Sequence, residues 1–380
     1  MILAIAVLSL LIWLNCLLLR GGYWRAVTTD RVPTPAPPEW PTIVAVIPAR
    51  NEEDSIAQSL VSLLEQDYPG RLSIVLVDDN SEDATAAIAE RIRSESESRV
   101  TLTILRGDSL PQYWTGKLWA MKQGIDAAKQ TQPDFLLLTD ADIVYEPDVV
   151  RWLAAHSVSN DTVLTSLMAK LRCESFAERA FVPTFVYFFQ MLYPFAWVND
   201  ARRMTAAAAG GCMLVKADAL AQAGGIAVIR DALIDDCSLA KVMKSQGPIW
   251  LGLTQRVHSI RASEAISDIH TMVSRSAYAQ LRYSPILLLG TLFGMALTYW
   301  APPLLAIFGH GAARALALGT WAAMTVSFWP ILRFYGLTPL WAPALPAIAT
   351  GYMAFTLSSA LQHFSGRGGR WKGRYQAKKV

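Results

Sequence analysis

Acidic residues are confined to the first part of this sequence, and their distribution constrains the fold more than any other feature. Of the 31 Asp and Glu residues, one is Asp30 and the other thirty lie between Glu39 and Asp268. The last 112 residues, from Ile269 to Val380, contain none, although they hold ten Lys and Arg residues. Over the whole chain only 17% of residues are charged and 53% are hydrophobic, whereas an ordinary soluble domain has about 25% charged residues. The sequence therefore predicts a globular central region joined to apolar flanks that lie in a membrane.

The first residues predict a membrane anchor. Residues 1–19 are almost entirely apolar, and about 19 helical residues at 1.5 Å each nearly span a hydrocarbon core. A cleavable signal peptide is the alternative, but it needs basic residues before the apolar run, whereas here Arg20 and Arg25 follow it. By the positive-inside rule these arginines place the rest of the chain in the cytoplasm. We expect an uncleaved anchor over residues 1–20 and a proline-rich linker over residues 21–41.

A second membrane region is expected at residues 286–364, where three apolar segments of spanning length lie at 286–308, 312–332 and 340–361. Three crossings would carry the C-terminus out of the cytoplasm. The tail at 365–380, however, holds six Lys and Arg residues and no acid, which by the positive-inside rule belongs in the cytoplasm. We therefore expect an even number of crossings, with the proline-broken segment 340–361 re-entrant or doubled back. The alternative is that the tail is an ordinary solvated terminus.

A fourth apolar segment, residues 181–198, is rich in aromatic residues and lies inside the globular region. Pro183, Gln190 and Pro194 interrupt it, so we expect it not to span a membrane. A buried core helix is one interpretation. We favour an interfacial helix on the inner leaflet, close to the point where a lipid substrate would enter.

Cysteine spacing and charge argue against several other classes of protein. The four cysteines show no Cys-x-x-Cys spacing and no nearby His in the register of a metal site, so neither a disulfide framework nor a zinc site is indicated. The isoelectric point of 8.6 reflects the acid-free C-terminal region rather than a basic surface on the globular part. We expect no nucleic-acid partner.

The central region alternates short apolar runs with longer segments of helical period. Runs at 42–48, 72–78 and 135–139 are predicted strands, and residues 54–66 and 84–95 are predicted helices. Strands that alternate with helices indicate a parallel sheet that is covered on both faces. The sequence therefore predicts an α/β domain over residues 42–285.

Polar residues follow three of these strands, at 48–53, 78–83 and 140–142. Ligands bind beyond the C-terminal ends of the strands in such sheets. Helix capping would explain any one of these loops, but not three at one edge. Carboxylates that gather without compensating cations raise one another's pKa, so a hard divalent cation would stabilise them. Asp140 and Asp142 therefore predict a site for Mg²⁺ or Mn²⁺ that also takes diphosphate oxygens.

Seven short motifs occur in order between residues 42 and 283. They are PARNEE (48–53), VDDNSED (77–83), GKLWAMKQG (116–124), TDAD (139–142), GGCMLV (210–215), IDD (234–236) and QLRY (280–283). This order resembles the family-two inverting glycosyltransferases with the A-type nucleotide-binding fold, a parallel-rich mixed sheet between helices. The anchor, the C-terminal spans and a WKGR sequence at 371–374 are most similar to the hopene-associated glycosyltransferases, and more distantly to ceramide and carotenoid glycosyltransferases.

The resemblance implies a nucleotide-sugar site and a metal site. Carried over by motif position, the residues beside the nucleotide-sugar are Ala49, Glu52, Asp79, Gly116, Lys117, Asp140, Gln280 and Arg282, and those at the metal are Asp140 and Asp142. Lys117 also has a charge argument, because an ammonium amid diphosphate oxygens offsets negative charge as the leaving group departs. A solvated lysine at a helix start is the alternative. The QLRY motif has Tyr in place of Trp and is one residue short, so Arg282 is either a diphosphate contact or an arginine that snorkels to the inner leaflet.

An inverting reaction needs a carboxylate opposite the departing diphosphate to take the acceptor's proton. The resemblance assigns this role to Asp236, with Asp235 standing where most family members have Glu. Helix capping is the alternative for both, and Asp231 is an alternative carboxylate. Gly210 and Gly211 would let an acceptor approach the backbone closely.

The expected function is inverting transfer of a sugar from a UDP-linked donor to a membrane lipid, a hopanoid or a related polyisoprenoid. The expected enzyme is a metal-dependent hexosyltransferase that crosses a bacterial-type inner membrane several times, with its catalytic domain in the cytoplasm. A processive polysaccharide synthase is one alternative, although such enzymes usually have more spans and a complete QxxRW motif. An inactive membrane scaffold that retains a nucleotide-sugar domain is the other.

Overall fold

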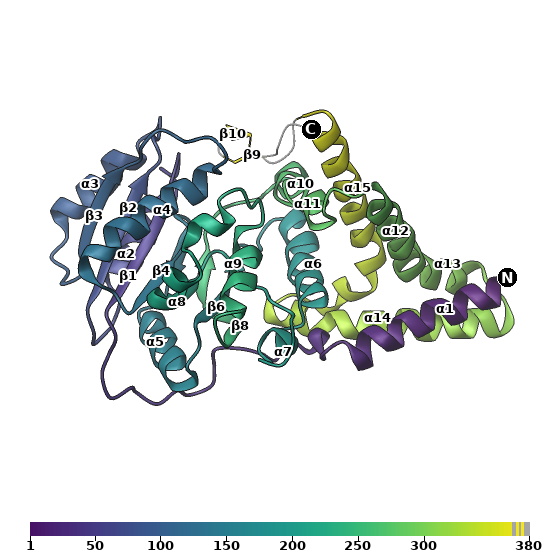
Figure 1. Cartoon of the computed structure of the whole chain (residues 1–380). Coiled ribbons are helices and arrows are strands. Elements are labelled where there is room, and N and C mark those ends of the chain that lie inside the picture. The colour runs from purple at the N-terminus through teal and green to yellow at the C-terminus, as the bar shows by residue number, and fades with distance from the viewer. Residues whose placement is uncertain (367–369, 372–373, 376–380) are drawn as a thin grey trace.

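The computed structural model describes residues 1–366, 370–371 and 374–375. Figure 1 shows a twisted sheet at one side of the molecule, with helices on both faces of the sheet. A group of long helices extends away from the sheet, and the N-terminus lies at the far end of this group. Most of the basic tail, including residues 372–373 of the WKGR sequence, lies outside the described residues.

Eight strands form one mixed sheet in the order β3-β2-β1-β4-β7-β6-β8-β5. The strands β1, β2 and β4 are parallel, as predicted, and β3 is parallel to β2. In contrast, β7 runs antiparallel to both β4 and β6, and β5 runs antiparallel to β8. The strands are β1 (Ile43–Ala49), β2 (Leu72–Asp78), β3 (Thr101–Arg106), β4 (Phe135–Leu138), β5 (Ile143–Tyr145), β6 (Leu164–Leu171), β7 (Met213–Lys216) and β8 (Ile249–Ser259), with the separate pair β9 (Arg370–Trp371) and β10 (Arg374–Tyr375).

The helices fall into a set around the sheet and a set of apolar segments. The helices in and around the globular part are α2 (Ile56–Leu64), α3 (Thr85–Glu95), α4 (Gly116–Ala128), α5 (Val149–Asn160), α6 (Phe176–Leu192), α7 (Phe195–Val198), α8 (Ala217–Gln222), α9 (Asp235–Lys244), α10 (Ile266–Ser274) and α11 (Ala277–Gln280). The apolar segments are α1 (Ile2–Leu14), α12 (Pro285–Met295), α13 (Ala301–Phe308), α14 (Gly311–Phe334) and α15 (Leu345–Phe364).

The centre of the sheet is covered on both faces. All seven residues of β1 are buried, which is why its sequence reads as a nearly continuous apolar run. Successive side chains of a strand point to opposite faces. Val44 and Val46 accordingly pack in the cluster that includes α4, whereas Ile43 and Ile47 pack in the cluster that includes α2. The strands and helices predicted for residues 42–139 are confirmed, with ends shifted by one or two residues.

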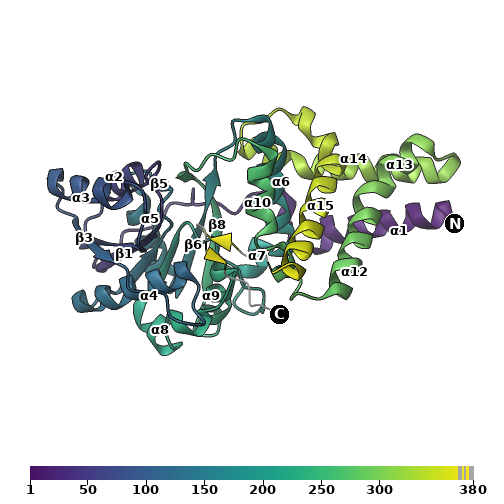
Figure 2. The ribbon, with the colours of Figure 1, turned by 90° about the horizontal axis from the view of Figure 1, so that it is seen from above.

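Among the described residues, five helical segments are long and apolar enough to cross a membrane: Ile2–Leu19, Phe176–Val198, Pro285–Phe308, Gly311–Phe334 and Pro339–Phe364. In Figures 1 and 2, α1 and α14 lie side by side and both end at the side of the sheet. The helix α15 runs steeply across them in both views and packs on α6, α10 and α11. The expected doubling back within residues 340–361 is wrong, because a short 3₁₀ helix (Pro339–Ala344) leads directly into the unbroken α15.

The aromatic-rich segment 181–198 is less broken than expected. Pro183 lies inside α6 without ending it, and the helix stops only at Leu192, before Pro194. The segment Phe176–Val198 is half buried, and α6 contacts α10, α14 and α15. It therefore joins the sheet domain to the apolar helices.

The contact between α4 and β1 requires a glycine. A Cβ on Gly124 would lie 2.4 Å from Val46 Cγ1 in the middle of the core. We expect Gly124→Ala to lower the free energy of unfolding by about 1–3 kcal/mol, because the added methyl overpacks the core. Thermal unfolding of the purified protein in detergent measures this loss. Gly319→Ala in α14 is the matched control, since a Cβ there would meet no atom within 4 Å. Equal midpoints for the two variants would contradict the packing argument.

Candidate active site

A cleft of about 600 Å³ opens beyond the C-terminal ends of β1 and β4. Its wall carries charged residues from several elements together with apolar residues of α6 and α10. The charged residues are Glu52, Lys117, Asp140, Asp142, Arg172, Asp235, Asp236, Arg261, Asp268 and Arg275. The strand ends thus bring together side chains that are far apart in the sequence.

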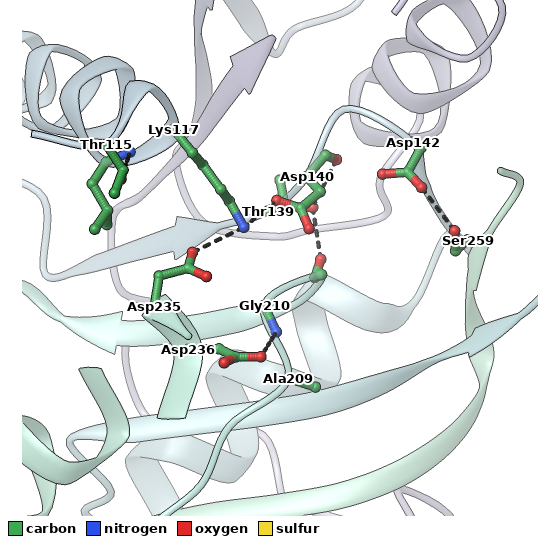
Figure 3. A network of polar contacts seen from close by, with 12 residues as sticks. Thr115, Lys117, Thr139, Asp140, Asp142, Ala209, Gly210, Asp235, Asp236 and Ser259 are labelled. Atoms are coloured by element: carbon green, nitrogen blue, oxygen red, sulfur yellow. Dashed lines mark hydrogen bonds and ion pairs between the residues drawn. The ribbon is translucent and has the colours of Figure 1, made fainter. Parts of the chain in front are cut away.

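Lys117 links two carboxylates at the centre of this cleft (Figure 3). It lies in the first turn of α4, where the Thr115 side chain caps the helix by accepting a hydrogen bond from the Leu118 amide. Its Nζ atom lies 2.8 Å from Asp140 Oδ1 and 2.9 Å from Asp235 Oδ2. Burial opposes the charge of Lys117, but the two carboxylates outweigh it and raise its pKa, so the ammonium is retained.

The two carboxylates respond differently to their surroundings. Burial raises the pKa of Asp140 above the ordinary aspartate range, and the ammonium of Lys117 offsets only part of that effect. Burial also acts on Asp235, but there the attraction of Lys117 prevails and lowers the pKa. Asp235 is therefore held as a carboxylate and neutralised by its ion pair.

Within the described residues, no Lys, Arg or His side chain forms an ion pair with Asp236. Its Oδ2 atom accepts a hydrogen bond of 3.2 Å from the Gly210 amide, and its Oδ1 atom accepts one of 2.7 Å from the Cys237 amide. Burial, followed by the charge of Asp235, raises the pKa of Asp236 to about 6. The start of α9 thus holds one carboxylate that is neutralised and one that is poised to take a proton near neutral pH.

Asp142 belongs to a second ion-pair group at the other side of the cleft. Its Oδ2 atom accepts hydrogen bonds from Ser259 Oγ at 2.8 Å and from Arg261 Nε at 3.2 Å. Arg261 Nη2 also lies 2.8 Å from each carboxylate oxygen of Glu52. Although burial disfavours its charge, Asp142 and Glu52 raise the pKa of Arg261 and keep it cationic. Arg261 therefore ties the loop after β1 to the start of β5.

Asp140 and Asp142 are suited to a divalent cation as a pair. Carboxylate oxygens are the ligands that Mg²⁺ and Mn²⁺ prefer, and these ions are usually held by one or two carboxylates plus water and phosphate oxygens. Within the described part of the chain, no group of three or more His, Cys, Asp or Glu side chains is placed to enclose a metal. The donor set thus fits a cation that shares its coordination with a bound diphosphate.

The structure brings most of the predicted site residues together. Those that line the cleft are Glu52, Lys117, Asp140, Asp142, Gly210, Gly211, Asp235 and Asp236. A Cβ on Gly210 would lie 3.5 Å from Lys117 Nζ, whereas one on Gly211 would lie 2.9 Å from Ile143 Cδ1. Gly210 thus faces the polar centre, and Gly211 is needed for close packing.

Five predicted residues do not line the cleft: Ala49, Asp79, Gly116, Gln280 and Arg282. Ala49 and Asp79 are buried at the ends of β1 and β2, where the Asp79 amide donates a 2.8 Å hydrogen bond to the Ala49 carbonyl. Gly116 is buried at the start of α4, directly before Lys117. Gln280 Nε2 donates to the hydroxyl of Tyr193 at 2.6 Å.

Sequence reasoning missed the arginines of the cleft. Arg261 follows β8 by two residues, so the rule that found the other loops, polar residues after a strand, would have found it if β8 had been recognised. Arg275 also lines the cleft and contributes to the lowered pKa of Asp235, whereas Arg282, the predicted arginine, does not line it. No local pattern distinguishes these two arginines.

Part of the cleft wall is apolar. Val182, Phe185 and Phe189 from α6 line the cleft together with Met272 from α10. These helices also pack against α15 and, for α6, against α14. The apolar part of the wall is therefore built by the elements that join the sheet domain to the apolar helices.

Comparison with known proteins agrees with this geometry. Residues 44–222 match the sequence profile of the family described as Glycosyl transferase family 2. An N-acetylglucosaminyltransferase of Rhizobium leguminosarum bv. viciae is 32% identical over 139 residues, which are 36% of this chain and 30% of that protein. A β-monoglucosyldiacylglycerol synthase of Synechocystis is 31% identical over 121 residues (32% of this chain, 24% of that protein). A 4,4'-diaponeurosporenoate glycosyltransferase of Staphylococcus haemolyticus is 35% identical over 102 residues (27% and 24%).

The matches cover between 24% and 30% of the length of these curated relatives. Among solved structures, a mannosyltransferase from Pyrobaculum calidifontis in complex with GDP-Man and Mn²⁺ aligns with a TM-score of 0.59 and 20% identity, over 94% of this chain and 99% of that one. At this identity the likeness concerns the fold. Residues 44–222 are therefore similar to glycosyl transferase family 2, and the mixed sheet is the A-type glycosyltransferase fold.

Proposed function

We propose that this protein transfers a sugar, with inversion, from a nucleoside diphosphate sugar to a membrane lipid. The observation that carries the proposal is the composition of a single cleft. Lys117, Asp140 and Asp142 line it together with Phe185 and Phe189 of α6, and Asp236 lines the same cleft. A charged donor and an apolar acceptor can thus meet beside one carboxylate of raised pKa.

Asp236 is the proposed general base. A base must accept the proton of the acceptor hydroxyl as that oxygen attacks the sugar, and it works best with a pKa near the operating pH. Its pKa of about 6 meets this condition, whereas Asp235 is committed to Lys117. The unpaired carboxylate therefore supports Asp236 over its neighbour.

Asp140 and Asp142 are the proposed ligands of Mg²⁺ or Mn²⁺. When bound, the cation would offset the negative charge that develops on the departing diphosphate. Lys117 would bind the same diphosphate from the start of α4, where backbone N–H groups also favour an anion. The resemblance of residues 48–53 and 77–83 to the family motifs supports a uridine nucleotide, with Glu52 near it.

A lipid is the proposed acceptor, and a hopanoid or related polyisoprenoid is the proposed lipid class. The names of two relatives, a glucosyldiacylglycerol synthase and a diaponeurosporenoate glycosyltransferase, refer to lipid acceptors and support the broader class. The similarity of the whole layout to hopene-associated glycosyltransferases supports the narrower one.

The proposed function is tested by measuring whether the sugar of the donor becomes attached to lipid. Membranes that contain the protein, incubated with radiolabelled nucleotide-sugars, should yield labelled lipid on extraction. Asp236→Asn should lower the initial rate by roughly 10²–10⁴-fold, because it keeps the shape of the side chain but removes its proton affinity. The wild-type rate should rise as the pH increases through about 6, since the base acts in its deprotonated form.

Asp235→Asn is the matched control for Asp236→Asn. It should cause a smaller loss, because Asp235 holds Lys117 rather than the acceptor proton. Near-wild-type transfer by Asp236→Asn would refute the base assignment. Absence of labelled lipid with every donor, despite intact nucleotide binding, would favour an inactive scaffold.

The metal assignment is tested by binding rather than by turnover. Asp142→Asn should weaken Mn²⁺-dependent nucleotide binding at least tenfold by calorimetry, because it removes a charged ligand. Asp126→Asn, at the other end of α4, should bind the nucleotide as the wild type does. Wild-type affinity that is the same with Mn²⁺ and with EDTA would contradict the assignment.

We also propose a topology in which the sheet domain and both ends of α15 lie in the cytoplasm. The turn between α13 and α14 is at the far end of the apolar helices, so residues 285–334 leave the sheet side and return to it. The helix α15 then packs on α6, α10 and α11, which belong to the sheet side. Two C-terminal crossings therefore reconcile the apolar segments with the basic tail.

Cysteine accessibility distinguishes this topology from three crossings. In a background in which the four native cysteines are alanine, Glu97→Cys and Ser365→Cys should react with an impermeant reagent only from the cytoplasmic side. His310→Cys, in the turn between α13 and α14, should react only from the opposite side. Labelling of Ser365→Cys from the same side as His310→Cys would show that α15 crosses.

A further inference from the structure

A second cavity, of about 590 Å³, lies where the chain leaves α1 and where α14 ends. Its wall is built from residues 24–31, from residues 253–255 of β8 and from the last turns of α14. Gln255 Nε2 fixes this junction by donating a 2.6 Å hydrogen bond to the carbonyl of Phe334 at the end of α14. None of its lining residues lines the active-site cleft.

Three arginines line this second cavity without a carboxylate partner. Within the part of the chain that the structure describes, no acidic side chain forms an ion pair with Arg25, Arg31 or Arg333. The single acid in the wall, Asp30, is already neutralised by Arg256, whose Nε lies 3.0 Å from its Oδ2 atom. The cavity therefore has a net positive wall, and an anion is the ligand that would compensate it.

An exposed apolar strip leads along α14 to this cavity. Leu318, Val326 and Trp329 are each about half exposed, at 48%, 56% and 51%, and they share one face of the helix with Arg333. Trp24 also lines the cavity, and the Arg25 guanidinium lies 5.4 Å from its ring. An apolar strip that ends in tryptophan and arginine matches a molecule with an acyl chain and an anionic head.

We infer that this cavity binds the phosphate headgroup of an anionic phospholipid from the leaflet on the side of the sheet domain. Arg25, Arg31 and Arg333 would hold the phosphate, since guanidinium groups bind its oxygens in pairs. The acyl chains would lie along the exposed strip of α14. The inference rests on the proposed membrane insertion and is independent of the sugar-transfer step.

Binding is measured as a lipid-dependent rise in thermal stability, because a ligand that binds only the folded state stabilises it. The full-length protein in neutral detergent is titrated with phosphatidylglycerol, with phosphatidylcholine, or with inorganic phosphate. We expect phosphatidylglycerol alone to raise the unfolding midpoint. Arg333→Gln and the double variant Arg25→Gln/Arg31→Gln should need at least tenfold more phosphatidylglycerol for the same rise, and Arg333→Lys should recover part of it.

Arg314→Gln is the matched control, because it removes one exposed arginine from the opposite end of the same helix. It should respond to phosphatidylglycerol as the wild type does. Equal responses of Arg333→Gln and Arg314→Gln would overturn the site, as would equal stabilisation by phosphatidylcholine. A full effect of inorganic phosphate would show a soluble-anion site and overturn the lipid assignment. This experiment does not measure sugar transfer. If a separate assay finds no transfer while phosphatidylglycerol still stabilises the protein, that result counts against the proposed function alone.

Discussion

The ion pairs of Lys117 with Asp140 and Asp235 are the contact on which the active site depends. Three segments far apart in the sequence, the start of α4, the loop after β4 and the start of α9, meet at this one ammonium. Two carboxylates so close together would raise each other's pKa without it. The cation therefore holds the cleft in shape and decides which of the adjacent aspartates, Asp235 or Asp236, is left to take a proton.

Much of the fold follows from short-range patterns in the sequence. The buried run of β1 and the helical period of α2 and α3 are local features, and they predict the parallel part of the sheet. The strands β3, β5, β6, β7 and β8 were not predicted, and of these β5 and β7 are only three and four residues long. The continuity of α6 through Pro183 was also missed, because packing against other helices, rather than propensity, holds that segment together.

The residues of the candidate site were also predictable only in part. Lys117, Asp140, Asp142 and Asp236 lie in motifs, and a motif can be read from the sequence alone. Arg261 reaches Glu52 across about two hundred residues of sequence, and its partners become evident only when β1, β5 and β8 are placed in one sheet. The pairing of Asp30 with Arg256 is likewise a product of tertiary structure.

The shared ammonium has a consequence for the order of events during turnover. Asp235 lies beside Asp236, and its charge is one cause of the raised pKa there, whereas Lys117 counteracts that rise. In the proposed reaction, a diphosphate that draws Lys117 away from Asp235 would uncover this negative charge and make Asp236 more basic. Binding of the proposed donor would thus strengthen the proposed proton acceptor, so that the sugar is loaded before the lipid hydroxyl is activated.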